Sequence, residues 1–92
     1  MAYGASKYAL ESYSLSAACE LGAYGITVNV VAPGPTQTGY ITPEAETSLL
    51  RNIPLGRLGQ PEDIAEAILG VVRSPYMTGE IVLVDGGLSL VS

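Results

Sequence analysis

The sequence predicts an α/β fold, and three observations support this. Residues 3–21 contain no proline and consist mostly of good helix formers. Two short apolar runs, 26–32 and 80–87, have the length of strands, and turn-forming residues close each of them. Two segments that begin near a proline, 42–52 and 61–73, predict further helices. The order helix, strand, helix, helix, strand is typical of layered α/β domains.

The first helix is expected to run from Tyr3 to about Leu21. Its apolar residues recur with helical spacing, as at Ala9, Tyr13 and Ala17. Gly22 is expected to end the helix, because glycine adopts the left-handed conformation at little cost. Small side chains along the helix would let a neighbouring helix approach closely; they are Ala5, Ser6, Ala9, Ser12 and Ser16.

The run Ile26–Ala32 is apolar enough to be covered on both faces, as in a parallel sheet. Residues 33–39 contain turn residues throughout and predict a loop. Thr42 and Pro43 then provide a cap and a first-turn proline, which together predict the start of a helix.

A second helix start follows at Pro61, where two acidic residues favour the positive end of the helix dipole. The helix is expected to face the core with Ile64, Ile68, Val71 and Val72. The last strand closes with Asp85-Gly86-Gly87, whose glycines permit a tight turn. Because a two-stranded sheet is marginal alone, the chain is expected to be incomplete as a domain.

Composition limits the possible functions and locations. The chain has 92 residues, of which 48% are hydrophobic, and a net charge of −5. Its four cations are scattered, which argues against nucleic-acid binding. No apolar run reaches the roughly 20 residues of a membrane span, and no metal site is expected. Cys19 is the only cysteine, so we expect a reducing compartment, the cytoplasm, and a buried thiol within the helix.

Tyr3 and Lys7 lie four residues apart on the predicted helix, and Lys7 is the only lysine in the chain. Residues at this spacing share a helix face, with Cβ atoms about 5–6 Å apart. A phenol with a pKa of about 10 is a poor base at neutral pH. A nearby ammonium favours the phenolate by roughly 4 kcal/mol at most. The pair is therefore either a proton donor with its activator or a surface tyrosine beside a solvated lysine.

Four motifs decide between these readings. They are "YGASK" (3–7), "GITVNVVAPGPTQT" (25–38), "GRLGQPEDIAEAI" (56–68) and "MTGEIVLVDGG" (77–87). In this order and spacing they resemble the short-chain dehydrogenase/reductase family over essentially the whole chain. The resemblance implies a doubly wound Rossmann-type fold, with this chain as its C-terminal portion. It also implies hydride transfer between NAD(H) or NADP(H) and a carbonyl or secondary alcohol, such as a 3-oxoacyl thioester.

The resemblance implies roles for individual residues. Tyr3 matches the family's catalytic acid/base, and Lys7 matches the lysine that lowers the pKa of that tyrosine and binds the nicotinamide ribose. Asn29 matches a residue that we expect to be structural. Pro33 and Gly34 match the turn that brings the backbone against the cofactor. Thr36 matches a residue whose backbone meets the carboxamide of the nicotinamide, and Thr38 matches a threonine whose hydroxyl contacts the phosphate or carboxamide end of the cofactor. Without the resemblance, both threonines would be read as turn residues that satisfy local backbone.

The resemblance also places residues 39–59 in the variable region with which the family covers its substrate. Two readings are open for four side chains of this region, which either line a substrate pocket or pack as part of an ordinary amphipathic helix: Tyr40, Ile41, Leu49 and Leu50.

Other parts of the family pattern are missing from these residues. No strand, glycine cluster and helix start combine into a phosphate-binding loop. The family's catalytic serine and asparagine belong upstream of Tyr3, and Ser6 does not occupy the serine position. The residue that selects NAD or NADP is also upstream. We therefore expect an upstream segment in the parent enzyme and no turnover by the 92-residue chain alone.

Two functions remain open from the sequence. The first is part of an NAD(P)-dependent oxidoreductase that forms a homo-oligomer, since the family often pairs subunits through the long helix and the last strand. The second is a truncated, non-catalytic product that persists as an association module, because exposed sheet edges invite pairing. Binding of a nicotinamide cofactor distinguishes the two functions.

Overall fold

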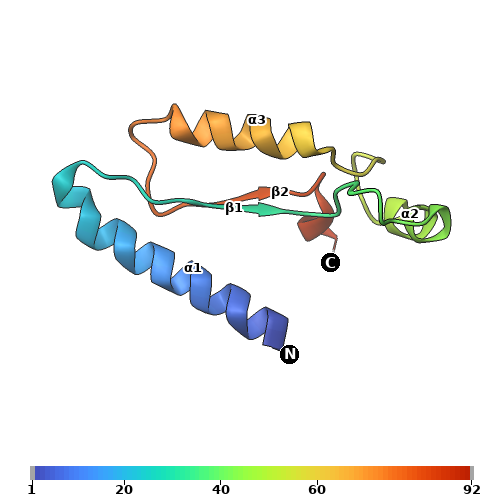
Figure 1. The fold of residues 1–92 in the computed structure, drawn as a ribbon, viewed down its shortest axis with the longest axis horizontal. Coiled ribbons are helices and arrows are strands. Elements are labelled where there is room, and N and C mark those ends of the chain that lie inside the picture. The colour runs from blue at the N-terminus through green and yellow to red at the C-terminus, as the bar shows by residue number, and fades with distance from the viewer. Residues whose placement is uncertain (1, 92) are drawn as a thin grey trace. The chain divides into compact units, whose positions relative to one another are not determined.

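The computed structural model describes the backbone of residues 2–91 and the side chains of residues 7–91. Its elements follow the predicted order of an α/β fold (Figure 1). They are α1 (Ala2–Leu21), β1 (Val30–Pro33), α2 (Pro43–Leu50), α3 (Pro61–Val72) and β2 (Ile81–Val84). The predicted fold class is thereby confirmed, whereas both strands are shorter than predicted.

β1 and β2 pair as a two-stranded sheet. The Val30 N–H donates to the Glu80 carbonyl at 2.9 Å, and the Gly34 N–H donates to the Val84 carbonyl at 2.9 Å. The offset between donor and acceptor is the same in both bonds, so the two strands run in parallel. Parallel pairing is what the apolar, β-branched sequence of the first strand predicts.

The chain divides into two compact units. The first contains the chain up to Val30 together with Val71–Val82, and the second contains Val31–Gly70 together with the chain from Leu83 onward.

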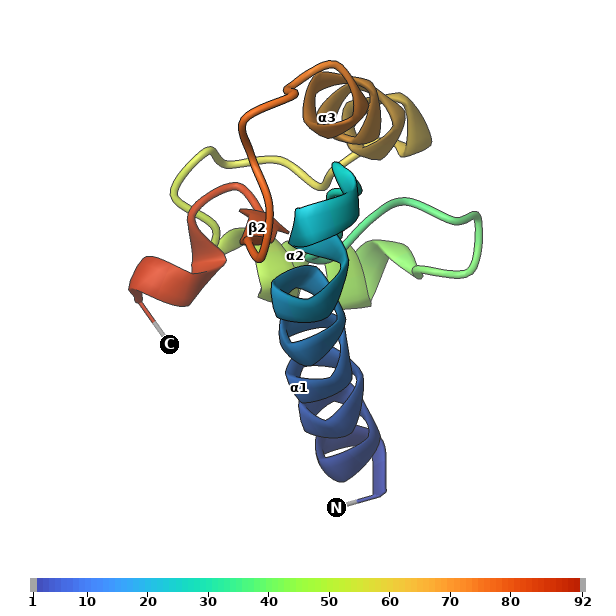
Figure 2. The ribbon, with the colours of Figure 1, turned by 90° about the vertical axis from the view of Figure 1, so that its left-hand side faces the viewer.

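In the first unit, α1 ends at Leu21 as predicted, but the residue after it that takes the left-handed conformation is not Gly22. After Leu21 the chain tightens into a 3₁₀ turn over Gly22–Tyr24, drawn in teal in Figure 2. Gly25, with φ 74°, takes the left-handed position. The Ile26 N–H bonds the Leu21 carbonyl at 3.3 Å, and the Gly25 N–H bonds the Gly22 carbonyl at 3.0 Å, the two bonds of a Schellman motif. The prediction that Gly22 is left-handed was wrong because the helix gains this extra turn.

Side chains replace part of the strand ladder in the first unit, which explains the late start of β1. The Val28 N–H donates to the Thr78 hydroxyl at 3.1 Å. The Asn29 side chain donates to the Met77 carbonyl at 3.2 Å and accepts from the Glu80 N–H at 3.0 Å. Asn29 thus holds the approach to β2 with both ends of its amide, which confirms its predicted structural role.

Little of α1 is buried. Ala18 is the buried hydrophobic residue of this helix among the described side chains. A Cβ added at Gly79 would lie 3.8 Å from that of Ala18, so the two segments are in close contact. Large apolar side chains elsewhere on α1 are exposed, among them Tyr8, Leu10 and Tyr13. Cys19 is exposed as well, so the prediction of a buried thiol was wrong.

In the second unit the buried apolar side chains are Ala32, Ile53 and Leu58. α2 begins as predicted, with Pro43 at its first position and the Ala45 N–H donating to the Thr42 hydroxyl at 3.2 Å. It ends at Leu50, two residues earlier than expected, because turn bonds to the Leu49 and Leu50 carbonyls follow.

α3 also begins at the predicted residue, but its apolar stripe does not face a core. Ile64 and Val71 are half-buried, whereas Ile68 is 45% and Val72 is 74% exposed. The helix has the predicted amphipathic pattern, yet these two side chains are exposed, so the expected burial was wrong there. No helix in the described part of the chain is both long and apolar enough to cross a membrane.

Candidate functional site

The loop that follows β1 is held by a short backbone bridge in the second unit. Thr36 pairs in parallel with Gly59, which lies just before α3. The Gly59 N–H donates to the Pro35 carbonyl at 3.0 Å, and the Gln37 N–H donates to the Gly59 carbonyl at 2.8 Å. The residues on either side of Thr36 therefore direct their bonding groups toward Gly59.

The backbone of Thr36 itself faces the other way. In extended chain, successive residues direct their N–H and C=O groups to opposite sides. Because Pro35 and Gln37 bond Gly59, the Thr36 N–H and C=O point away from Gly59, and neither makes a hydrogen bond among the described residues. Thr36, a half-buried residue, thus presents a backbone donor and a backbone acceptor side by side.

The two threonines of this loop differ in what their side chains do. The Thr36 hydroxyl donates to the Gly34 carbonyl at 2.9 Å, a local turn contact. The Thr38 side chain is exposed and has no bonding partner among the residues described. The backbone of Thr36 and the hydroxyl of Thr38 thus make no hydrogen bond among the described residues.

Gly34 is required where the loop passes the end of β2. A Cβ placed on Gly34 would lie 2.5 Å from the Asp85 Cβ and 2.7 Å from the Asp85 Cα. Any residue other than glycine would place its Cβ at these distances, which are shorter than contacts between non-bonded carbon atoms, so only glycine fits here. The absence of a side chain at Gly34 therefore brings the loop against the turn at Asp85. The adjoining Pro33 ends β1 and is exposed.

Asp85 organises the turn after β2 with its carboxylate. Oδ1 accepts from the Gly87 N–H at 3.0 Å, and Oδ2 accepts from the Ser89 N–H at 3.0 Å and from the Ser89 hydroxyl. Hydrogen bonds from Ser89 and Gly87 lower the pKa of Asp85. The predicted glycine turn is confirmed: Gly86 and Gly87 have φ of 65° and 92°, and the Leu55 N–H donates to the Gly86 carbonyl at 3.0 Å.

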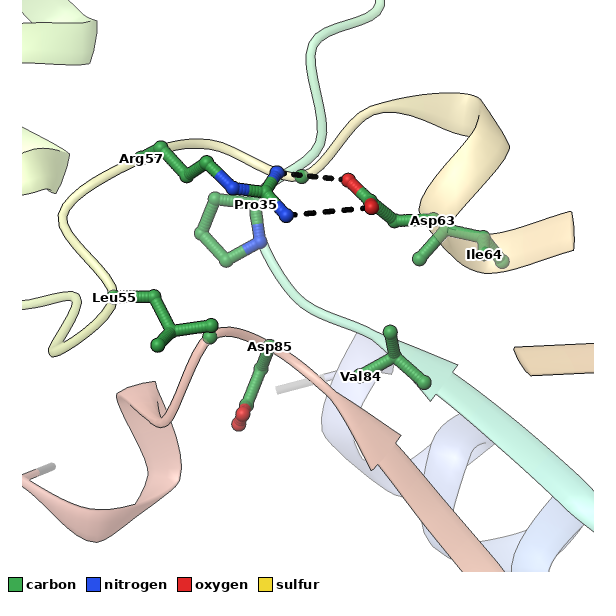
Figure 3. A pocket seen from close by; sticks show the side chains of 9 residues that line it. Pro35, Leu55, Arg57, Asp63, Ile64, Val84 and Asp85 are labelled. Atoms are coloured by element: carbon green, nitrogen blue, oxygen red, sulfur yellow. Dashed lines mark hydrogen bonds and ion pairs between the residues drawn. The ribbon is translucent and has the colours of Figure 1, made fainter. Parts of the chain in front are cut away.

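Arg57 and Asp63 form an ion pair beside the bridge, and the sequence interpretation missed it. Arg57 Nη1 lies 2.9 Å from Asp63 Oδ2, and Nη2 lies 3.3 Å from Oδ1 (Figure 3). Hydrogen bonds from Arg57 and from the Gln60 N–H lower the pKa of Asp63. The signal was present, since Asp63 is the third residue of a recognised helix start, where an acid can reach back to the capping residue.

The second unit contains cavities, and two of them lie near the residues described above. The ion pair borders one of about 80 Å³, together with Pro35, Leu55 and Ile64, and the Asp85 carboxylate points away from the pair (Figure 3). This volume is far below the roughly 300 Å³ of a small-molecule site, so a dinucleotide does not fit there. The other, about 450 Å³, is an open and mainly apolar hollow along Pro54, Leu83 and Leu90. Neither is lined by Tyr40, Ile41, Leu49 or Leu50, and Tyr40 is 91% exposed.

Tyr3 and Lys7 both lie on α1, in the first unit. The helical backbone places the two positions one turn apart, in the register that the motif requires. The Lys7 side chain is exposed, and that of Tyr3 lies outside the described residues. The pair lies in the first unit and the Thr36 loop lies in the second.

Acid should weaken the second unit through its two engaged carboxylates. A carboxyl whose pKa is lower in the folded state contributes stability above the ordinary pKa of 3.8 and loses it as the pH falls through the lowered value. We expect urea midpoints to be insensitive to these groups from pH 7 to about 4 and to fall below that. Asp85→Asn should flatten the acid limb, whereas Glu66→Gln, at an exposed helical position, should leave it unchanged. An unchanged acid limb in Asp85→Asn would contradict this expectation.

Comparison with known proteins identifies the family of this chain. A family model described as enoyl-(acyl carrier protein) reductase matches residues 1–89, nearly the whole length. The chain belongs to the short-chain dehydrogenase/reductase family. The α/β order and the parallel pair of strands agree with a part of the Rossmann-type fold of these dehydrogenases/reductases.

Curated members of the short-chain dehydrogenase/reductase family are similar over almost all of this chain. It is 49% identical over 88 residues to carbonyl reductase family member 4 of Danio rerio, covering 96% of this chain and 37% of the relative. It is 44% identical over 89 residues to 3-oxoacyl-[acyl-carrier-protein] reductase of Homo sapiens, covering 97% and 38%. Cyclohexanol dehydrogenase of Rhodococcus sp. (strain TK6) is 46% identical over 93 residues, covering 95% and 34%. The chain thus spans about 37% of the length of the relatives it matches first.

Proposed function

We propose that this chain forms the nicotinamide-facing part of an NAD(P)-dependent oxidoreductase that reduces a carbonyl or oxidises a secondary alcohol. The observation that carries the proposal is the backbone of Thr36, whose N–H and C=O make no hydrogen bond among the described residues and point away from Gly59. Family membership supports the same reaction class.

The chemistry of a carboxamide fits this backbone. A primary carboxamide carries one carbonyl acceptor and an NH₂ donor, the complement of a peptide N–H and C=O on one extended residue. Two hydrogen bonds of this kind fix the rotation of the amide and with it the plane of the attached ring. The Thr38 hydroxyl, exposed two residues further on, is free to bind the neighbouring phosphate or carboxamide end.

Pro33 and Gly34 set the position of this backbone. Pro33 ends β1, and the Gly34 N–H is committed to the Val84 carbonyl. The close approach of Gly34 to Asp85 fixes where the loop leaves the sheet. We propose that both residues act at the cofactor by shaping this turn.

The proton is proposed to move at the Tyr3 hydroxyl. During reduction the phenol donates a proton to the carbonyl oxygen as the carbon accepts hydride, and in the reverse direction the phenolate removes the alcohol proton. The Lys7 ammonium, one helical turn away, stabilises the phenolate and can donate to the nicotinamide ribose hydroxyls. A reduced nicotinamide cofactor, when bound, supplies the hydride.

Substrate class is proposed from the relatives. Their names describe carbonyl reductase, 3-oxoacyl-[acyl-carrier-protein] reductase and cyclohexanol dehydrogenase, which share chemistry at a carbonyl or secondary alcohol. A 3-oxoacyl thioester or a small ketone therefore comes first among test substrates. The lone Cys19 favours a reducing compartment, and we propose the cytoplasm.

Association is the second candidate, and a specific observation favours it. Tyr8, Leu10 and Tyr13 are 73%, 59% and 76% exposed on α1. Exposed apolar side chains on one helix are typical of protein contacts. We propose a homo-oligomer through α1 in either case; as a purely associating module the chain would pair in this way without contributing to nicotinamide binding.

A chimera tests the proposed function. Residues 1–89 of this chain replace the corresponding segment of the Danio rerio relative, which supplies the upstream part. We expect the chimera to quench or shift NADPH or NADH fluorescence and to oxidise the cofactor when acetoacetyl thioester or a small ketone is added. The isolated chain is the control and should show no turnover. A folded chimera, judged by circular dichroism, that self-associates but binds neither cofactor would overturn the enzymatic proposal in favour of the association module.

A further inference from the structure

We propose that the Arg57–Asp63 ion pair is a positioning device for the cofactor-facing backbone of Thr36. This inference rests on the proposed function and adds two residues to it, neither of which reaches the reacting atoms. The chain of contacts runs from the ion pair to Gly59, and from Gly59 to both neighbours of Thr36.

The ion pair encloses the short segment Leu58–Gln60. Arg57 Nη1 donates both to Asp63 Oδ2 at 2.9 Å and to the Leu58 carbonyl at 3.2 Å. Asp63 Oδ2 also accepts from the Gln60 N–H at 2.7 Å. The backbone groups on the two sides of Gly59 are therefore bonded by the two partners of one ion pair. Figure 3 shows Arg57 and Asp63 directed toward each other above Pro35.

Gly59 is thereby left with a single orientation. The Leu58 side chain is buried, with 4% exposed, and this burial anchors the segment Leu58–Gln60. The Gly59 N–H and C=O then reach the Pro35 carbonyl at 3.0 Å and the Gln37 N–H at 2.8 Å. These two bonds determine which way the Thr36 peptide groups face. Loss of the ion pair should let Gly59 rotate and release Thr36 from its ligand-facing orientation.

The exposure of the pair separates positioning from general stability. The Arg57 and Asp63 side chains are 58% and 37% exposed. Exposed ion pairs contribute little to the free energy of unfolding because water screens them. Bidentate geometry, in contrast, fixes orientation strongly. The pair should therefore affect the local loop and cofactor affinity far more than the unfolding midpoint.

Hydrogen exchange of the 92-residue chain tests the first half of the inference. In Asp63→Asn we expect the Gln37 and Gly59 amides to exchange about tenfold faster, while the Val30 and Gly79 amides stay unchanged and the urea midpoint falls only slightly. Glu62→Gln is the matched control, since it removes an exposed charge from the same first turn of α3 and no bond. Arg57→Lys should show a partial effect because an ammonium cannot hold both carboxylate oxygens. Unchanged exchange at Gln37 and Gly59 in Asp63→Asn would overturn the inference.

Binding of NADPH and NADH to the chimera tests the second half. We expect Asp63→Asn to raise the Kd for the cofactor about fivefold and Arg57→Lys to raise it less, both measured by fluorescence titration, with kcat changed less than twofold. Asp63→Glu, which keeps the carboxylate, should restore most of the affinity, and Glu62→Gln should leave it unaltered. An unchanged Kd in Asp63→Asn, with a normal Kd in the unmodified chimera, would overturn the positioning role alone. Failure of the unmodified chimera to bind either cofactor would overturn the proposed function and this inference with it.

Discussion

Replacing Tyr3 by phenylalanine in the chimera is expected to lower kcat by roughly 10²–10⁴-fold, the usual contribution of a positioned acid or base. Phenylalanine keeps the ring and the helix but has no hydroxyl, so the proton has no donor. The Kd for NADPH or NADH, measured by fluorescence titration, should stay within about twofold of its original value. Normal turnover in Tyr3→Phe would show that another group supplies the proton.

The Lys7→Met variant is the companion to this experiment. Methionine keeps the length and helix preference of lysine but removes the ammonium. Activity and cofactor affinity should fall together, because one cation is proposed to stabilise the phenolate and to bind the ribose. Glu20→Gln, which removes an exposed charge from the same helix, is the matched control and should leave both quantities unchanged. If Lys7→Met lost activity but kept its Kd, Lys7 would not bind the ribose, and only its stabilisation of the Tyr3 phenolate would remain.

Gly34→Ala is expected to destabilise the second unit by about 3 kcal/mol or more, at the upper end of the cost of overpacking. The new methyl group would lie 2.5 Å from the Asp85 Cβ and 2.7 Å from its Cα. The clash involves backbone, so no side-chain rotation relieves it. Urea denaturation of the 92-residue chain, followed by circular dichroism, measures the change.

Gly22→Ala provides the control for this effect. No atom lies within 4 Å of a Cβ added at Gly22, and its φ is not positive. Alanine there should be neutral or stabilise by up to about 1 kcal/mol, because it restricts the unfolded chain. If Gly34→Ala were as stable as Gly22→Ala, the close approach of the loop to Asp85 would not exist in solution.

The sequence predicted the features that depend on local chemistry. Thr42 followed by Pro43, and Pro61 followed by two acids, marked both helix starts because capping and proline geometry are local properties. The order of elements followed from the alternation of helix formers and β-branched residues. The structural role of Asn29 and the tight glycine turn at Asp85 were also predicted, and both have the expected geometry.

Other features depend on contacts that no local pattern encodes. The left-handed residue after α1 is Gly25 because a 3₁₀ turn extends the helix. β1 begins late because the side chains of Thr78 and Asn29 replace ladder bonds. The helix start at Pro61 marks Asp63 as a capping residue, but the pairing of Asp63 with Arg57 could be predicted only by knowing that the segment between them folds back on itself. Such long-range consequences decide how the Thr36 backbone is presented.

The central claim is that the Thr36 backbone receives the carboxamide of a nicotinamide cofactor. The most direct measurement is the ¹H–¹⁵N shift of the Thr36 amide in the chimera, titrated in parallel with the oxidised dinucleotide that binds and with the matching ADP-ribose compound that lacks nicotinamide. We expect a large change in the chemical shift of the Thr36 amide, and slowed hydrogen exchange of this amide, when the dinucleotide binds but not when the ADP-ribose compound binds. Equal responses to both ligands, or none with a dinucleotide that demonstrably binds, would contradict it.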